Sequence, residues 1–447
     1  MERLFGTDGI RGIANRELTA EMAVSIGRAA ATVLSNGLKR SPLFIIGADT
    51  RESSEMLVAA VSAGLCAAGA NILVVGVIPT PAVAFLVKLR GADAGIMISA
   101  SHNPFDYNGI KIFNSDGFKL PDESENEIED IVLGRKKISP ASGEIGRISF
   151  DKDGADAYLT YLKSRIGVNL EGLEIAIDCA NGSATRTAER LFWGLGAKVH
   201  MLSNAPNGRN INENCGSTHI ENLQKYVIEN KLDCGLAFDG DADRLLCVDE
   251  YGNLVDGDEI MAICALDMKK NGKLTHNTVV GTVMTNFGFM KFCRKQDINF
   301  IATKVGDRFV LEEMNRMGYA LGGEQSGHIV LREHATTGDG QLTALTLLSI
   351  MTKENKSLSS LASVMTKTPQ TLINLSVSAD KKSLFHTDAE IENAIREASA
   401  KFGNKGRIVV RPSGTEPLIR VMAEGEDADM NEKTARNLAN KIAERLV

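Results

Sequence analysis

The chain has 447 residues, too many for one ordinary hydrophobic core, so roughly two to four domains are expected. Hydrophobic residues make up 43% and charged residues 24%, values typical of a folded globular protein and not of a disordered one. The formal net charge of −7 argues against a general nucleic-acid binder, because contacts with phosphates need a basic surface.

The cysteines and the apolar segments argue against further classes of protein, namely zinc-binding, redox, secreted and membrane proteins. The seven cysteines contain no Cys-x-x-Cys pair, so reduced thiols in the core are expected and a zinc knuckle or redox dithiol is not. The N-terminal stretch "MERLFGTDGIRG" has no apolar signal segment, and the longest apolar tract, residues 71–87, is interrupted by Pro79 and Pro81. We therefore expect a cytoplasmic protein without a membrane or nucleic-acid partner.

A strand followed by an amphipathic helix is the recurring pattern along the chain. It is seen at residues 43–69, 71–87, 173–196 and 277–295. Such alternation predicts α/β layers with mostly parallel sheets. Ligands collect at the carboxyl ends of the strands in these sheets, and the strands here end in polar turns.

Changes in composition suggest the domain boundaries. Residues 133–153, rich in Gly, Ser and charge, predict a linker or a surface hairpin, a new helix is expected at Asp256 after a hairpin, and Pro369 interrupts a helical pattern. The last stretch predicts a small α+β domain. We expect four domains of ordinary size, at residues 1–150, 151–254, 255–367 and 368–447.

The stretch "MISASHNPFDYNGIKIF", residues 97–113, leaves a strand and presents Ser101 and His102 just before a proline. A hydrolase nucleophile, a metal ligand and a polar turn are all compatible with this pair, but the Gly-x-Ser-x-Gly elbow is absent. If Ser101 carries a phosphoryl group, its charge of roughly −1.5 to −2 would complete a metal site formed elsewhere in the chain. Lys111 would then be a proton acceptor or a charge stabiliser.

Three aspartates alternate with small residues in "GLAFDGDADRLLCVDE", directly after an apolar strand. In an extended loop, Asp239, Asp241 and Asp243 project to one side and converge. Convergent carboxylates repel one another unless a hard cation lies among them. A solvated acidic turn is the alternative, but three carboxylates at a strand end followed by Arg244 favour a metal. The spacing of a calcium loop is incomplete, so Mg²⁺ is expected.

Two further motifs suit a sugar phosphate. In "GGEQSGHIVL", Glu324 and Ser326 lie between glycines, and their side chains are suited to sugar hydroxyls, although His328 in the same motif fits a structural histidine equally well. In "FGTDGIRG", Arg11 is a further candidate for contact with a phosphate.

The stretch "VVRPSGTEPLIRV" combines arginines, hydroxyls and a glycine between two strands. Guanidinium groups and backbone N–H groups together bind a phosphate dianion, and the alternative is a plain turn with surface arginines. The candidate phosphate ligands are Arg411, Ser413, Gly414, Thr415 and Arg420.

Taken together and in this order, the motifs resemble the α-D-phosphohexomutase superfamily over nearly the whole chain. The motifs are "FGTDGIRG", "ISASHNP" with "NGIKIF", "FDGDADR", "KVGDRFV", "GEQSGH", "TTGDGQ" and "RPSGTEPLIRV". Each is modest alone, and the set is specific. The combination of "GEQSGH", "ATTGDGQ" and "VGDRFV" points to the branch that acts on glucosamine phosphates.

The resemblance implies four domains around a central cleft, three α/β domains with mixed sheets and a smaller α+β C-terminal domain. It implies a phosphorylated Ser101, one Mg²⁺ held by that group with Asp239, Asp241 and Asp243, and a sugar bisphosphate as primer. His102, Lys111, Arg244 and Arg11 are then expected near the reacting phosphate, Glu324 and Ser326 on the sugar, and the phosphate ligands named above on the non-reacting phosphate. The implied activity converts glucosamine 6-phosphate into glucosamine 1-phosphate, which supplies UDP-N-acetylglucosamine and cell-wall precursors. A homodimer and an activating kinase are compatible with the resemblance.

Three alternatives remain open at this point. The same chemistry on glucose or mannose phosphates would use the same residues. A phosphatase would be expected to use Asp, not Ser, as its nucleophile. A sugar-phosphate-binding protein without turnover would have no evident need for a phosphorylatable serine beside three carboxylates.

Overall fold

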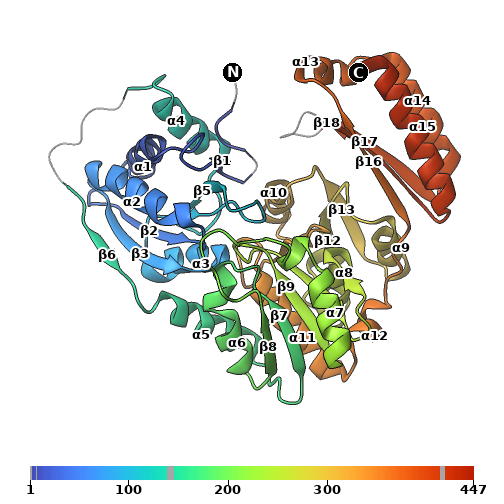
Figure 1. Ribbon diagram of the computed structural model, residues 1–447, viewed down its shortest axis with the longest axis horizontal. Coiled ribbons are helices and arrows are strands. Elements are labelled where there is room, and N and C mark those ends of the chain that lie inside the picture. Colours follow the sequence, from blue (N-terminus) through green and yellow to red (C-terminus); the bar gives the residue numbers. More distant parts are fainter. Residues whose placement is uncertain (1–2, 7, 138–144, 413–417, 447) are drawn as a thin grey trace.

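The computed structural model describes residues 3–6, 8–137, 145–412 and 418–446. Within these ranges the chain forms four successive sheets, each with its own helices, and we call the four units domains 1 to 4 (Figure 1). The prediction of an α/β fold with mixed sheets and a smaller α+β unit at the C-terminus is confirmed.

Domain 1 is a six-stranded mixed sheet with helices on both faces (Figure 1). Its elements are β1 (Ile10–Ile13), α1 (Ala20–Leu34), β2 (Leu43–Ala48), α2 (Glu52–Ala67), β3 (Asn71–Val77), α3 (Thr80–Arg90), β4 (Ala94–Ile98), β5 (Tyr107–Asn114), α4 (Asp122–Val132) and β6 (Ile148–Phe150). The order is β1-β5-β4-β2-β3-β6, and β5 runs antiparallel to both β1 and β4. The loop that joins β4 to β5 therefore reverses the direction of the chain, and Ser101 lies in this loop just beyond the end of β4.

The segment that follows α4 differs from the expected linker or surface hairpin. Strand β6 extends the sheet edge by pairing in parallel with β3, with Ile72 opposite Ile148 and Val74 opposite Phe150. Three exposed residues give no periodic signal, so the sequence alone did not separate this edge strand from a linker.

Domain 2 has a five-stranded sheet in the order β11-β10-β9-β7-β8. Its elements are α5 (Gly154–Ile166), β7 (Glu174–Asp178), η1 (Ser183–Arg186), α6 (Ala188–Trp193), β8 (Lys198–Leu202), η2 (Gly216–Thr218), α7 (Glu221–Asn230), β9 (Cys234–Phe238), β10 (Leu245–Asp249) and β11 (Leu254–Val255). Strands β7, β8 and β9 are parallel, and β9 and β10 form an antiparallel pair. The turn between β9 and β10 carries the three aspartates.

Domain 3 has a four-stranded sheet in the order β13-β12-β14-β15. Its elements are α8 (Gly257–Lys270), η3 (Thr275–Asn277), β12 (Thr278–Thr282), α9 (Phe287–Lys295), β13 (Asn299–Thr303), α10 (Asp307–Met317), β14 (Leu321–Gly323), β15 (Ile329–Leu331), α11 (Gly340–Glu354) and α12 (Leu358–Ala362). Helix α8 begins after Asp256, as predicted, because Asp256 and Glu259 form a reciprocal capping box.

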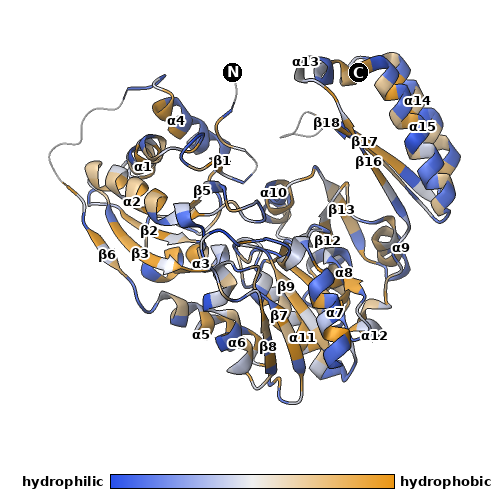
Figure 2. Cartoon of the chain, viewed as in Figure 1, coloured by the Kyte–Doolittle hydropathy of each residue, from blue (hydrophilic) through white to orange (hydrophobic). Residues whose placement is uncertain are grey.

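Domain 4 has a three-stranded antiparallel sheet in the order β16-β18-β17. Its elements are β16 (Gln370–Ser376), α13 (Ala379–Lys382), η4 (Ser383–His386), α14 (Ala389–Phe402), β17 (Gly406–Pro412), β18 (Leu418–Gly425) and α15 (Ala428–Leu446). Helices α14 and α15 cover the outer face of the sheet (Figure 1). Both helices carry hydrophobic as well as hydrophilic residues (Figure 2). The buried residues of α14, Ile391, Ala394, Ala398 and Phe402, recur at helical spacing, as expected for a helix with one buried face.

The cores explain which parts of the molecule form one body. One cluster of buried apolar side chains runs through domains 1, 2 and 3, from Ile45 through Phe192 to Leu348. Domain 4 has a core of its own, which includes Phe402, Ile419 and Leu438. Because apolar side chains pack continuously across the first three domains, their relative positions are fixed by close packing.

The cysteines and the lengths of the apolar helices bear on the class of protein. All seven cysteines carry free thiols, as expected, and six of them are buried. Among the helices that the structure describes, we find none with an apolar stretch long enough to cross a bilayer.

Candidate active site

Ser101 lies at the start of the loop between β4 and β5, in a left-handed conformation with φ of 54°. A non-glycine residue in this region costs energy and persists only where surrounding contacts hold it. The backbone N–H of Ser101 donates to the hydroxyl of Ser99 at 3.0 Å. The hydroxyl of Ser101 donates to Oδ2 of Asp239 at 2.6 Å, so the serine of domain 1 directly contacts the acidic turn of domain 2.

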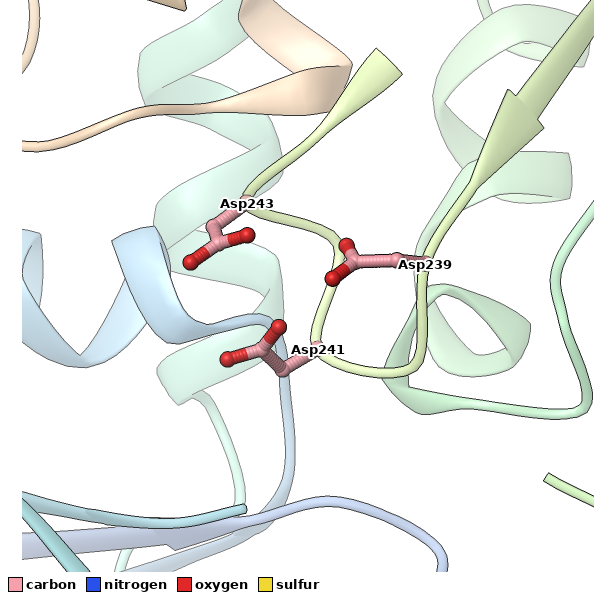
Figure 3. Close-up of side chains that lie close together, drawn as sticks. All are labelled: Asp239, Asp241 and Asp243. Atoms are coloured by element: carbon pink, nitrogen blue, oxygen red, sulfur yellow. The ribbon is translucent and has the colours of Figure 1, made fainter. Parts of the chain in front are cut away.

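The three aspartates converge, as predicted. One oxygen from each of Asp239, Asp241 and Asp243 lies within 4.8 Å of the others, and all three residues are buried. Figure 3 shows the three carboxylates pointing toward a common space beside the turn. The prediction of an extended loop is wrong in one respect. The chain forms a tight turn, in which the N–H of Ala242 donates to the carbonyl of Asp239 and Ala242 has φ of 56°.

The carboxylates have the properties of an incomplete cation site. Burial, together with the charges of Asp243 and Asp241, raises the pKa of Asp239 well above its usual value. Within the described residues, one buried oxygen of Asp241 and one of Asp243, Oδ1 in each case, lack a hydrogen-bond partner. Buried oxygens without partners are costly, and hard divalent cations prefer oxygen ligands. The residues present therefore fit a Mg²⁺ ion.

Lys111 supplies part of the compensating positive charge. Its Nζ on β5 lies 2.7 Å from Oδ2 of Asp241, 3.3 Å from Oδ2 of Asp243 and 2.9 Å from Oδ2 of Asp8. Burial by itself would lower the pKa of Lys111, but the charges of these three aspartates outweigh it and raise the pKa. In turn, burial raises and the charge of Lys111 lowers the pKa of Asp241, which settles at about 2.

Arg244, His102 and Arg11 also lie around the Ser101 loop. Nε of Arg244 is 3.9 Å from Asp239 and 3.8 Å from Asp243. Nδ1 of His102 is 3.4 Å from the hydroxyl of Ser101. Burial and the charges of Arg244 and Arg11 lower the pKa of His102 to about 3, so its ring is neutral near pH 7. Arg11, on β1, is ion-paired with Asp8 and donates to the side chain of Asn103 at 3.1 Å.

The two candidate sugar ligands lie in the loop between β14 and β15. Oε1 of Glu324 accepts a hydrogen bond from the backbone N–H of Gly306 at 3.1 Å. The charge of Glu324 is among those that raise the pKa of Arg244, against the effect of burial and after the charges of Asp239 and Asp243. Ser326 is exposed. The structure thus brings Glu324 to the side of the site where Arg244 lies.

The candidate phosphate ligands belong to domain 4, whose helices α14 and α15 stand apart from α1 and α2 of domain 1 in Figure 1. Arg411 on β17 and Arg420 on β18 are direct cross-strand partners. Because they are directly opposite each other, their side chains lie on the same face of the sheet. Ser413, Gly414 and Thr415 lie outside the described residues.

Three residues of the site were not predicted as site residues from the sequence, namely Asp8, Lys119 and His328, although His328 was noted as a structural histidine. Lys119 forms ion pairs with Asp8 of domain 1 and Asp307 of domain 3. His328 is buried, with Nε2 3.5 Å from Asp307 and 3.9 Å from Asp243. Asp8 lies three residues before Arg11 in "FGTDGIRG", which is a weak hint of an ion pair, whereas nothing near Lys119 indicates its two partners.

Comparison with known proteins gives consistent results along the chain. Four family models match, described as phosphoglucomutase/phosphomannomutase alpha/beta/alpha domain I at residues 2–138, domain II at 156–252, domain III at 256–368 and the C-terminal domain at 372–441. The phosphoglucosamine mutase of Acetivibrio thermocellus is 53% identical over 448 residues and that of Clostridium perfringens 51% over 444, covering 100% and 99% of both chains respectively.

Solved structures share the fold. A phosphoglucomutase/phosphomannomutase family protein from Burkholderia thailandensis superimposes with a TM-score of 0.81 at 24% identity, covering 100% of this chain and 99% of that one. The N-acetylphosphoglucosamine mutase of Aspergillus fumigatus, solved with GlcNAc-6P and magnesium, gives a TM-score of 0.75 at 16% identity, covering 100% of this chain and 96% of that one.

Proposed function

The chain belongs to the phosphoglucomutase/phosphomannomutase family, and we propose that it interconverts glucosamine 6-phosphate and glucosamine 1-phosphate. The enzyme is an isomerase, an intramolecular phosphotransferase of the phosphoglucosamine mutase type, and its product supplies UDP-N-acetylglucosamine and cell-wall precursor synthesis. The observation that carries the chemistry is the 2.6 Å contact between the Ser101 hydroxyl and the buried carboxylate turn. A serine in this position is a suitable carrier for a phosphoryl group.

The reaction consists of two transfers between Ser101 and the sugar. First, the bond between Oγ of phosphorylated Ser101 and phosphorus breaks, while the free hydroxyl oxygen of the sugar phosphate forms a new bond to phosphorus. The proton of that hydroxyl is released and Oγ of Ser101 takes up a proton, so that the serine is left as a free hydroxyl. The resulting glucosamine 1,6-bisphosphate turns around in the site. Its other phosphoryl group then returns to Oγ of Ser101, and the phosphorylated serine is restored. Both steps depend on alignment and on neutralising the charge of the transferred group.

The side chains around Ser101 divide this work by their geometry. Lys111, surrounded by three carboxylates, stabilises charge. Arg244 lies beside the acidic turn and Arg11 beside the Ser101 loop, so both guanidinium groups can neutralise charge on the reacting phosphate. His102, 3.4 Å from the Ser101 hydroxyl, is within reach of the proton that the transfer releases. Asp239, Asp241 and Asp243, with phosphorylated Ser101, would hold Mg²⁺, which neutralises the transferred phosphoryl group when bound.

The ligands for the rest of the substrate come from domains 3 and 4. Glu324 and Ser326 bind sugar hydroxyls. Arg411, Ser413, Gly414, Thr415 and Arg420 grip the phosphate that is not reacting, in either orientation of the intermediate. Because domain 4 has its own core, it can close over the substrate as a unit and exclude water from the phosphorylated serine.

The remaining elements of the proposal concern priming, assembly and location. A sugar 1,6-bisphosphate or an activating kinase phosphorylates Ser101 before the first turnover, and the enzyme works as a monomer or a homodimer. The cytoplasm is the proposed location, where seven free thiols remain reduced. The domain limits are those proposed from the sequence, at residues 150, 254 and 367.

The test is the ratio of kcat/KM for glucosamine 6-phosphate and glucose 6-phosphate, measured with Mg²⁺ and a priming bisphosphate. We expect a preference of ~100-fold for the amino sugar, which corresponds to about 2.7 kcal/mol of differential transition-state binding. Equal rates would assign the enzyme to general hexose phosphate isomerisation. Release of inorganic phosphate without an isomer would indicate a phosphatase, and binding without turnover would indicate a sugar-phosphate receptor.

A further inference from the structure

We infer that Arg51 and Asn212 are positioning residues that hold the Ser101 loop in its reactive conformation, by donating to the same two backbone carbonyls, one from domain 1 and the other from domain 2. We call the two residues the loop clamp. Neither side chain hydrogen-bonds to a carboxylate of the acidic turn or takes part in the transfers described above. The inference rests on the proposed function, because the loop is held for a reaction at Ser101.

The shared carbonyls are those of Ser101 and Asn103. Nη2 of Arg51 donates to the carbonyl of Ser101 at 3.0 Å and to that of Asn103 at 2.9 Å. Nδ2 of Asn212 donates to the same carbonyls at 2.9 Å and 3.0 Å. Each carbonyl oxygen has two lone pairs, so both donors are accommodated. The loop is thereby fixed on either side of His102, where the left-handed turn at Ser101 has to be maintained.

Arg51 is itself held rigidly at the start of α2. Its side chain is fully buried, and Nε lies 2.8 Å from Oδ2 of Asp49. Nη1 donates to two further carbonyls, that of Pro104 in the loop and that of Tyr107 at the start of β5. The carboxylate of Asp49 also accepts from the hydroxyl of Ser99 at 2.6 Å, and Ser99 in turn accepts from the N–H of Ser101. One buried arginine thus links the ends of β2, β4 and β5.

Asn212 brings the second domain into the clamp. It lies in the loop between β8 and η2, with φ of 59°, and its own N–H donates to the carbonyl of Ala180 at 2.9 Å. The acidic turn packs against the same place. A Cβ atom on Gly240 would lie 2.5 Å from the carbonyl oxygen of Ser101 and 2.9 Å from Nδ2 of Asn212. The clamp and the turn therefore set the position of Ser101 relative to Asp239 across the domain boundary.

The clamp acts by position and not by charge. The positive charge of Arg51 is paired with the adjacent carboxylate of Asp49, and Asn212 is neutral. What the two residues supply is a set of donors in fixed geometry, and an arginine has more of these in one plane than a lysine. A displacement of a reacting group by about 1 Å costs ~100-fold in rate, which sets the size of the expected effect.

The main test uses Asn212→Ala in the full-length enzyme. We expect kcat to fall by ~100-fold while KM for glucosamine 6-phosphate changes by less than about threefold, because the lost contacts are within the protein. In hydrogen–deuterium exchange, amides of residues 99–107 should exchange at least about tenfold faster than in the wild type. Asn210→Ala is the matched control, because its side-chain amide donates to the carbonyl of Ala205 in the same loop and does not reach the Ser101 loop.

Two conservative variants distinguish positioning from general stability. Asn212→Asp places an oxygen opposite the two carbonyls at a buried position, so we expect a lower thermal midpoint and a loss of kcat at least as large as in Asn212→Ala. We therefore measure kcat well below that midpoint, where the variant is folded and only positioning is compared. Arg51→Lys keeps the positive charge but loses the planar set of donors, so we expect its kcat to fall well below the wild-type value. A wild-type kcat in Arg51→Lys would overturn the inference. So would wild-type values of both kcat and amide hydrogen exchange in Asn212→Ala. If the wild type lacks mutase turnover, the proposed function fails, and the exchange measurement still decides whether the clamp holds the loop.

Discussion

The Ser101 hydroxyl donates a 2.6 Å hydrogen bond to Oδ2 of Asp239 across the boundary between domains 1 and 2. The serine comes from the loop between β4 and β5, and the aspartate from the turn between β9 and β10. A phosphoryl group on this serine would lie against three buried carboxylates. Such an arrangement is stable only if cations balance the charge, so the proposed phosphoryl carrier depends on Lys111 and on the proposed metal ion.

The first prediction concerns the nucleophile. Ser101→Ala removes the only oxygen that can carry the phosphoryl group in the proposed reaction, so we expect mutase turnover to fall by at least about 1,000-fold. Binding of glucosamine 6-phosphate, measured by calorimetry, should persist. Ser183→Ala is the control, because it removes another buried hydroxyl of the neighbouring domain without touching the carboxylates. Turnover that survives in Ser101→Ala would exclude the serine as carrier.

The second prediction concerns the metal. Mg²⁺ should raise the thermal midpoint of the wild type, because a ligand that binds only the folded state stabilises it by mass action. Asp243→Asn should lose most of this rise, since one charged ligand of three is replaced by a neutral amide. Asp249→Asn is the control, because Asp249 is a buried acid of the same domain that accepts hydrogen bonds from the backbone of Tyr251 and Asn253. An equal rise in Asp243→Asn would contradict the site.

The third prediction concerns Lys111, whose side chain is only 1% exposed. Lys111→Met leaves Asp8, Asp241 and Asp243 without their shared cation, and an uncompensated buried charge typically costs about 3–5 kcal/mol. We expect that loss in the free energy of unfolding in the presence of a chelator. Mg²⁺ should restore part of it, and by more than it stabilises the wild type. A variant as stable as the wild type without metal would show that the lysine does not balance these carboxylates.

How far the site could be predicted depends on the kind of contact. Asp239, Asp241 and Asp243 are close in sequence, so their alternation was sufficient to predict convergence. Arg51 and Asn212 reach backbone carbonyls 50 and 111 residues away, and a carbonyl carries no sequence identity. No pattern of residue types could therefore have indicated the loop clamp.

In the fold, too, local features could be predicted from the sequence and contacts between distant segments could not. Strand and helix periods predicted β2, α2, β12 and α9, where long apolar patterns decide the structure. The helix expected after β7 is divided into η1 and the short α6, because Thr187 between them has φ of −127°. The ion pairs of Lys119 with Asp8 and Asp307 also depend on how domains 1 and 3 pack together, which local sequence patterns do not encode.

The last prediction concerns the pH dependence of stability at Asp339, the N-cap of α11. Its carboxylate accepts from the N–H of Leu342 at 2.9 Å and from the hydroxyl of Tyr158 at 2.8 Å, yet burial dominates and raises its pKa from 3.8 to about 6. A raised pKa means that the folded state binds the proton more tightly than the unfolded state. The resulting stability is fully present below about pH 4 and is lost as the pH rises through about 6.

Asp339→Asn should remove this dependence, because asparagine caps a helix about as well as aspartate and cannot ionise. A shift of roughly 2 pKa units corresponds to about 3 kcal/mol, so the wild type should lose that much relative to the variant between pH 4 and 7.5. The measurement is chemical unfolding at several pH values. Asp388→Asn is the control of opposite sign, because the hydrogen bond from Arg445 lowers the pKa of that capping carboxyl, which stabilises the fold at higher pH. Parallel pH profiles for the wild type and Asp339→Asn would show that the buried carboxyl titrates normally.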